Sequence, residues 1–461
     1  MHVSGRTTDV DAGRRSIDGR VVALALGLAA TLVAGCISGT QTTSAPVAPV
    51  LTAAPTTVAA GPPSASPASM SPALTPALPS ATAFAPTPAL IPRWERIGPL
   101  SGPSLPAVSG VADLIGWDGG YVALLGYSSD RPARVLFSAD AASWQAIDLP
   151  APVLRPGLVA HGPAGLWDVT TDGRSVLVTG GQDHEPCGPT KTTPTRPCAM
   201  VPVSWITTDG IHWQASTPWM GPDEATIAAA WPMPGGWEAA VATRAYGEAR
   251  TADAIYRSTD GRTWKQSESF DGPTHTADDV MPLDGIVAQD GTRLSSWFEW
   301  WDPDAGTIPE DSGVWVSRAP GSWDPVRSAA FGAGTETLLV GALTAPGPDA
   351  PRLWALGGLV QADGSIAVWT SPDLVDWTAT RLAENPYEDG TPSGVTDLAA
   401  TPLGLIAVDV QEQGVWLTRD GVAWEAVDSP RIAVVASGPA GVIGVDDPDD
   451  GTDATVWRLI P

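Results

Sequence analysis

One short stretch decides how this chain folds: Ser258-Thr259-Asp260-Gly261-Arg262-Thr263-Trp264. The pattern Ser/Thr-x-Asp-x-x-x-Trp returns four more times along the sequence. A worn further copy, from Ser317 to Trp323, keeps the serine and the tryptophan but has no aspartate. The full copies contain these pairs: Asp140 and Trp144, Asp209 and Trp213, Asp260 and Trp264, Asp373 and Trp377, and Asp420 and Trp424.

Each copy predicts a tight turn between two strands. Ser, Asp and Gly favour turns, because short polar side chains bond to nearby amides and Gly accepts positive φ. Most copies have an aromatic residue two positions before the Ser/Thr, as at Trp205 and Tyr256, and a short alternating run after the Trp. The tryptophans are between 47 (Trp377 to Trp424) and 69 (Trp144 to Trp213) residues apart. This period is typical of propeller blades of about four strands.

The motif resembles the Asp-box, or BNR, repeat in a form with one residue fewer between Asp and Trp. That repeat occurs in sialidases, sortilin-type domains and photosystem II assembly factors, all of which are β-propellers. The resemblance extends over residues 93–461. It implies the fold more than an activity, since in that family the box lies on the hairpin between outer strands, away from the active centres.

The two ends of the repeat region complete one another. The segment Arg93–Ile97 matches the strand after a box, and Ala454–Leu459 matches the strand before one. We therefore predict an all-β fold: a seven-bladed β-propeller of four-stranded antiparallel blades, whose last blade is closed by an N-terminal strand that removes the exposed edges. Its blades are expected at 101–150, 151–218, 219–272, 273–329, 330–383, 384–430, and 431–461 with 93–100.

Residues 1–36 have the pattern of an export signal. Arginines precede an uncharged apolar run, Val21–Val33, that has the length of a signal-peptide core. It ends in Leu32-Val33-Ala34-Gly35-Cys36, which looks like a bacterial lipobox, so Cys36 is predicted to be lipidated. The alternative is an ordinary signal peptide with an incidental cysteine. The Pro/Ala/Thr/Ser-rich residues 37–92 predict a disordered tether before the propeller at 93–461.

These features predict an exported protein, lipid-anchored to the outer face of the cytoplasmic membrane and touching the membrane only through its anchor. The formal net charge of −26 argues against nucleic-acid binding, and a monomer is expected. Cys187 and Cys198 are predicted to form a disulfide, which the compartment permits after export. A metal site with His184 is the alternative, but the spacing matches no familiar zinc pattern.

Loops that join strands 2 to 3 and 4 to 1 of propeller blades share the face opposite the box hairpins. Long insertions fall in such 2–3 loops and predict a ligand site on their rim: Gln182–Met200, Gly247–Asp253, Asp302–Gly313 and Asp446–Asp453. Two residue sets stand out on this rim. The first set combines aromatic side chains with carboxylates, an arrangement that suits a sugar: Trp300, Trp301, Asp302 and Asp304. The alternative is that the aromatic side chains pack in the core.

The second set is acidic. It consists of Asp447, Asp449, Asp450 and Asp453. These residues could bind calcium, because carboxylates are calcium ligands; the alternative is a solvated acidic turn. Ca²⁺ is the one cofactor that the sequence suggests.

Taken together, we expect a cell-surface, lipid-anchored β-propeller that acts as a non-catalytic binding or scaffolding module for a protein or glycan ligand. Two alternatives stay open: a sialidase-like glycoside hydrolase and a purely structural envelope protein. The hydrolase needs three arginines on a carboxylate and a tyrosine nucleophile backed by a glutamate, for which Tyr387 and Glu388 are candidates. The Arg-Ile-Pro motif that begins many sialidases is absent, because Ile91-Pro92-Arg93 is a scrambled version.

Overall fold

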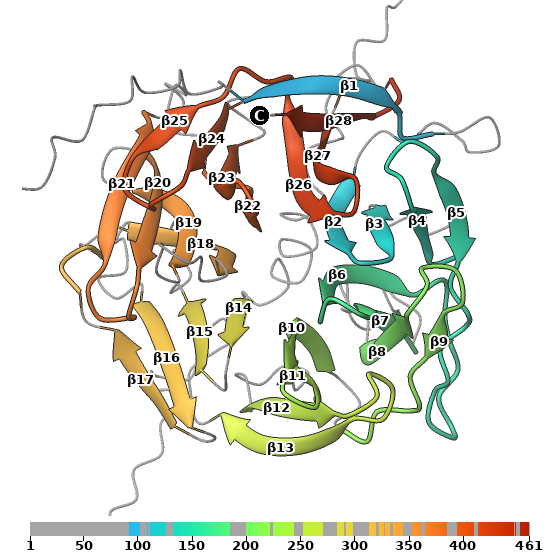
Figure 1. The fold of residues 1–461 in the computed structure, drawn as a ribbon. Coiled ribbons are helices and arrows are strands. Elements are labelled where there is room, and N and C mark those ends of the chain that lie inside the picture. The colour runs from blue at the N-terminus through green and yellow to red at the C-terminus, as the bar shows by residue number, and fades with distance from the viewer. Residues whose placement is uncertain are drawn as a thin grey trace, which may run out of the picture. The chain divides into compact units, whose positions relative to one another are not determined.

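The computed structural model confirms the predicted fold class. Its strands form seven four-stranded antiparallel sheets, the blades of a propeller (Figure 1). No helix in the described part of the chain is long and apolar enough to cross a membrane. The structure describes residues 92–101, 108, 111–125, 132–184, 200–221, 225–243, 252–270, 284–289, 292–297, 313–319, 322–326, 328–331, 335–343, 353–360, 365–384, 394–409, 414–446, 448 and 452–460.

In blades 1 to 6 the strands follow chain order from the inner to the outer edge. Blades 1 to 3 comprise β2 (Val111–Trp117), β3 (Gly120–Leu125), β4 (Arg134–Ser138) and β5 (Gln145–Asp148); β6 (Gly165–Thr171), β7 (Val176–Asp183), β8 (Met200–Thr207) and β9 (Gln214–Ala215); and β10 (Ala225–Met233), β11 (Gly236–Thr243), β12 (Ala252–Ser258) and β13 (Lys265–Phe270). Blades 4 to 6 comprise β14 (Asp284–Gln289), β15 (Thr292–Trp297), β16 (Gly313–Ala319) and β17 (Ser322–Val326); β18 (Thr335–Leu343), β19 (Trp354–Val360), β20 (Ser365–Ser371) and β21 (Thr378–Ala383); and β22 (Asp397–Thr401), β23 (Gly404–Asp409), β24 (Gly414–Thr418) and β25 (Trp424–Ala426).

Blade 7 is assembled from both ends of this region. It contains β26 (Ile432–Gly438), β27 (Gly441–Asp446) and β28 (Thr455–Ile460), and its outer strand is β1 (Arg93–Pro99). β1 runs antiparallel to β28, from the pair Arg93 and Ile460 to the pair Pro99 and Thr455. The predicted closure by an N-terminal strand is confirmed.

The inner strands close the ring. Contacts join neighbouring inner strands all the way round, in the order β2, β6, β10, β14, β18, β22, β26 and back to β2. Each blade therefore packs between two others, and both faces of its middle strands are covered. Such strands read as continuous apolar runs rather than alternating ones: every residue of β20 is buried, whereas no residue of the outer strand β5 is more than half-buried.

Two kinds of polar contact also join the inner parts of the blades. Asp168 on β6 accepts a hydrogen bond from the backbone N–H of Ala230 on β10 (3.3 Å), and Asp397 on β22 accepts one from Val435 on β26 (2.6 Å). Where blade 1 meets blade 7, the fully buried Tyr121 inserts its hydroxyl into the turn between β26 and β27. These contacts satisfy buried groups across the blade boundaries.

Candidate functional site

The recurring motif forms the same turn in all five full copies. In each copy one oxygen of the aspartate accepts hydrogen bonds from the backbone N–H groups two and three residues further on, at 2.7–2.9 Å. The same oxygen accepts a third bond from the Ser/Thr hydroxyl two residues earlier. The pKa of every box aspartate is lowered, because hydrogen-bond donors favour the charged carboxylate; at Asp209 the largest cause is the hydrogen bond with the His212 side chain.

The residue after each box aspartate has positive φ and faces the preceding blade. Glycine occupies this position in three copies, and Ala141 and Leu374 adopt φ of 64° and 65° in the other two. At Gly210 an added Cβ would lie 2.3 Å from the ring of Phe137 in blade 1, so the turn packs tightly on its neighbour. Trp213 joins the apolar cluster shared with blade 1. The box is thus a structural joint between blades.

The worn copy in blade 4 forms a different turn. The Ser317 hydroxyl donates to the carbonyl of Ala319 (3.0 Å), because no aspartate is present to accept it. Ala319 then pairs with Ser322 across a short hairpin between β16 and β17.

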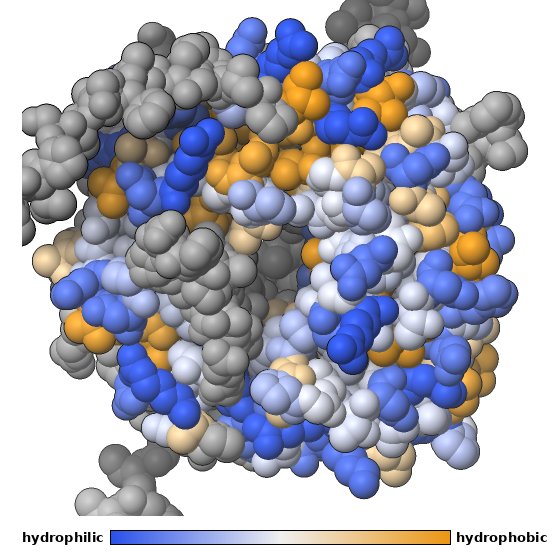
Figure 2. All heavy atoms as spheres, viewed as in Figure 1, coloured by the Kyte–Doolittle hydropathy of each residue, from blue (hydrophilic) through white to orange (hydrophobic). Residues whose placement is uncertain are grey.

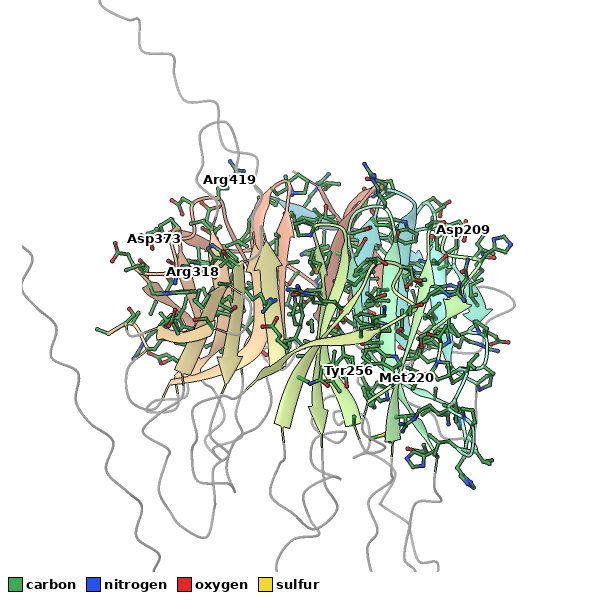
Figure 3. The ribbon with its side chains drawn as sticks, turned by 90° about the horizontal axis from the view of Figure 1, so that it is seen from below. Asp209, Met220, Tyr256, Arg318, Asp373 and Arg419 are labelled. Carbon is green, nitrogen blue, oxygen red and sulfur yellow. The ribbon has the colours of Figure 1, made fainter. Side chains whose placement is uncertain are left out.

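The two faces of the ring differ in what they carry. We call the face of the box turns the box face, and the opposite face, where the 2–3 and 4–1 connections emerge, the loop face. Asp209, Asp373 and Arg419 lie toward the box face and Met220 toward the loop face (Figure 3). The box turns are residues 138–144, 207–213, 258–264, 371–377 and 418–424.

Connection lengths follow the same division. All the predicted insertions fall between second and third strands, so they open on the loop face: 184–199 between β7 and β8, 244–251 between β11 and β12, 298–312 between β15 and β16, and 447–454 between β27 and β28. One long connection departs from this rule, because residues 344–353 join the first and second strands of blade 5 and open on the box face.

The described part of the loop face has an apolar patch at its rim. Val153 and Val159 lie on the connection from blade 1 to blade 2, Met220 lies on the next connection, and their exposed fractions are 56%, 66% and 78%. We call these three residues the rim patch. The box face exposes apolar side chains as well, at Ile211, Val375 and Val422 (44%, 62% and 61%), and Figure 2 shows hydrophilic and apolar residues intermixed on it. Single exposed apolar side chains are common on protein surfaces, whereas apolar side chains that gather in one patch are typical of contact surfaces.

A shallow groove lies between the same two connections. Its volume is about 10 Å³, room for about one water molecule, and it is lined by Val153, Leu154, Arg155, Leu158, Val201, Pro202, Pro218 and Trp219. Arg155 crosses it beneath the surface and donates to the carbonyl of Gly221 (2.9 Å). Trp219 stacks on Trp264 with 4.7 Å between ring centroids, and its buried indole N–H has no acceptor within the described residues. The groove therefore combines apolar walls with one cationic side chain and one donor.

Three titratable residues, Asp183, His184 and His161, lie together where the insertion of blade 2 begins. The Asp183 carboxyl is half-buried; burial raises its pKa, while His184 and His161 nearby act in the opposite direction. The backbone N–H of His161 donates to the carbonyl of Asp183 (2.8 Å), and buried Gln182 donates to the carbonyl of Gly162 (3.2 Å). These contacts fix the 4–1 connection against the end of β7. Within the described ranges, no three His, Cys, Asp or Glu side chains are close enough to hold a metal.

Asp453 is the one candidate calcium ligand that the structure describes. Its carboxylate accepts hydrogen bonds from the Ser101 hydroxyl (2.6 Å) and the Val108 backbone N–H (3.2 Å). The side chain therefore ties the segment after β1 to blade 7. Its neighbour Asp446 accepts a bond from the Trp457 indole (2.9 Å) within the hairpin.

The other predicted site residues lie outside the described ranges, so these assignments stay predictions. They are Cys36, Cys187, Cys198, Trp300, Trp301, Asp302, Asp304, Tyr387, Glu388, Asp447, Asp449 and Asp450.

Neither tyrosine in the described part of the chain is placed to act as the nucleophile of a sialidase-like hydrolase. Tyr121 and Tyr256 are 0% and 2% exposed and belong to the packing between blades. Several described arginines are held in structural contacts: Arg134 with Asp148 (2.6 Å), and Arg262 with the carbonyl of Ala215 (3.2 Å).

No pattern in the sequence indicated the rim patch or the groove. Isolated valines and methionines in loops carry no pattern, because their exposure depends on where the loop lies. The available signal was the aromatic Trp219, the first residue after a predicted blade boundary.

No protein-family model matches the chain, and no curated protein matches its sequence. Solved structures share features of the fold. A Trypanosoma rangeli sialidase in complex with 2,3-difluorosialic acid is 12% identical, with a TM-score of 0.42 over 69% of this chain. An α-L-arabinanase of Penicillium chrysogenum with arabinobiose is 12% identical, with a TM-score of 0.41 over 68% of this chain and 97% of its own.

A mutant α-L-arabinofuranosidase of Fusarium graminearum with an iminosugar inhibitor is 13% identical, with a TM-score of 0.40 over 68% of this chain and 96% of its own. The chain spans 53% of the length of the sialidase, about half. At these identities the likeness concerns the fold alone.

Proposed function

We propose that this chain is an exported, lipid-anchored β-propeller that binds a ligand on its loop face without transforming it. The box turns are committed to joining blades, since their aspartates and tryptophans are used in the turns and in interblade packing. The loop face, in contrast, carries four long 2–3 connections. The ring thus serves as a rigid frame and the connections as the variable surface, a division common in binding scaffolds.

The rim patch is the observation that carries this proposal. Met220, Val159 and Val153 expose 78%, 66% and 56% of their surface beside the groove. Burial of such side chains contributes roughly 25 cal/mol per Å² of apolar surface removed from water. A protein or glycan that covers this rim would gain that energy, and the apolar character of the patch favours a protein.

Arrays of glycans and peptides, probed with residues 91–461 as a soluble protein, test the proposal. Wild type is expected to bind a restricted set of probes. Met220→Glu is expected to weaken that binding at least tenfold. Val422→Glu is the matched control, because Val422 is 61% exposed but lies in a box turn. Equal losses in both variants, or binding that Met220→Glu leaves intact, would contradict a role for the rim patch.

A further inference from the structure

Among the described residues, the interface between blades 3 and 4 is the one at which buried charged side chains meet. Apolar clusters join every other pair of neighbouring blades. Within the described residues no such cluster joins blades 3 and 4. Four charged side chains lie there, which we call the ionic clamp: Glu238 on β11, Arg257 on β12, Glu268 on β13 and Arg293 on β15.

Arg293 crosses from blade 4 and holds Glu238 with two hydrogen bonds, Nε to Oε2 at 2.8 Å and Nη2 to Oε1 at 2.9 Å. Its Nη2 also donates to Glu268 (2.7 Å). Glu238 accepts further bonds from Arg257 Nε (2.6 Å) and the indole of Trp231 (3.0 Å). Glu238 and Arg293 are 2% and 3% exposed, whereas the Arg257 side chain is 38% exposed. The clamp is thus charge-balanced, and its central pair is buried.

The clamp stands where other blades have apolar residues. Arg293 pairs with Ser317, the serine of the worn box. The residues that pair with the box Ser/Thr in the other boxed blades are Tyr121, Val176, Trp237, Trp354 and Leu405. Glu238 follows Trp237, and the residue following Tyr121 is Val122. Arg293 and Glu238 thus both occupy core positions that hold apolar residues in other blades.

The clamp and the worn box coincide at one interface. In blade 2 the residue after the box aspartate packs on the preceding blade, as Gly210 does on Phe137. Blade 4 has no box aspartate, and its turn closes on Ala319 and Ser322 instead. The described residues of blade 4 therefore lack the aspartate-held turn of the full boxes, and Arg293 connects blade 4 to blade 3.

Buried ion pairs align two surfaces, but they contribute less net stability than apolar side chains of similar volume, because desolvation offsets their attraction. We propose that the interface between blades 3 and 4 is the seam at which this ring opens first. The clamp sets the alignment of the two blades, and its weak net contribution keeps the free energy of opening low. Such local openings cost less than global unfolding.

Two adjacent alanines on β11 provide a matched test. Ala239 belongs to the cluster shared with blade 2, whereas Ala240, the next residue of the strand, points to the opposite face, toward blade 4. Their exposed fractions are 0% and 2%, so neither is accessible in the closed ring. In soluble protein spanning 91–461, thiol labelling with peptide mapping is expected to modify Ala240→Cys at least tenfold faster than Ala239→Cys. Equal rates would overturn the proposal, because both sites would then open only in global unfolding.

Clamp variants, made in the Ala240→Cys background, assign the opening to the ionic cluster. Arg293→Leu leaves Glu238 without its bidentate partner and is expected to accelerate labelling by roughly 100-fold. The double variant Glu238→Val with Arg293→Leu makes the core apolar and leaves Arg257 beside Glu268, 3.9 Å apart. It is expected to label at least tenfold more slowly than the background protein. An unchanged or faster rate in the double variant would refute the seam, even if the single variant fails to fold.

Discussion

The Tyr121 hydroxyl allows the closure of the ring to be tested by removing one atom. It donates to the carbonyl of Gly441 (2.8 Å) and accepts from the backbone N–H of Ala440 (3.0 Å), both in the turn between β26 and β27. Burial raises the pKa of Tyr121, while the Ala440 N–H and Arg458 act in the opposite direction, so the hydroxyl remains a donor across the pH range of unfolding experiments. Tyr121→Phe removes both bonds and leaves the ring's apolar packing in place.

The expected loss follows from the two bonds. A neutral hydrogen bond contributes about 1 kcal/mol net, and the turn that loses its partners is partly solvated, since Ala440 is half-buried and Gly441 exposed. Water can therefore replace part of what is lost, and we expect Tyr121→Phe to lower the free energy of unfolding by about 1–2 kcal/mol. Urea unfolding followed by tryptophan fluorescence measures this loss in residues 91–461.

Tyr256→Phe is the control, because Tyr256 is equally buried and its hydroxyl makes no hydrogen bond with the described residues. Because a ring of this size can unfold through intermediates, hydrogen exchange of residues 438–442 provides a local readout. The reasoning is refuted if Tyr121→Phe is no less stable than Tyr256→Phe and leaves exchange in that turn unchanged.

Three further outcomes are expected. Asp420→Ala removes the acceptor for the N–H groups of Val422 and Ala423 (2.8 Å each) and should cost about 0.5–2 kcal/mol in urea unfolding, as helix-cap removal does. All five box aspartates have lowered pKa values in the folded state. The stability that they contribute is therefore complete above about pH 4 and is lost as pH falls through the folded pKa values. A urea midpoint that stays constant down to pH 3 would contradict this. Asp397→Ala removes the bond to Val435 (2.6 Å) and should accelerate exchange of that amide at least tenfold, with no change expected at Tyr121 as the reference site.

Most of the fold could be predicted because the box is a local signal. Its aspartate bonds lie within three residues, so the turn is determined by a heptapeptide such as Thr207–Trp213. The strand beside it follows from the buried aromatic two positions earlier, as at Trp205, which is 0% exposed. The closing strand was also predictable, because the segment after Arg93 repeats the pattern that follows a box.

The contacts between blades could not be predicted in the same way. Arg293 and Glu238 are 55 residues apart, and no fixed spacing links them, because the connections between them vary in length. The one signal in the sequence was the charge of Arg293 at a core position. It can be recognised only after β15 is aligned with the second strands of the other blades. The inner-strand aspartates are similar: Asp168 and Asp397 occupy equivalent positions, but the alignment depends on the strand pairing.

The position of the long insertions could be predicted from the sequence, but the residues of the rim patch could not. Long insertions between Gln182 and Met200 and elsewhere indicated the loop face, and the strand order places those connections there. Asp453 was one of four candidate calcium ligands, with a solvated acidic turn as the alternative, and its carboxylate bonds to Ser101 and Val108. A carboxylate in an acidic loop does not reveal by sequence which distant backbone it will meet.

The most direct test of a non-catalytic loop face follows binding and turnover on one sample. The array ligand bound most tightly is titrated into residues 91–461 and into Met220→Glu, and the recovered ligand is then analysed by mass spectrometry. We predict saturable binding by the wild type, at least tenfold weaker binding by the variant, and a ligand of unchanged mass after prolonged incubation. Cleavage of that ligand by the wild type would show that the propeller is an enzyme and contradict the account.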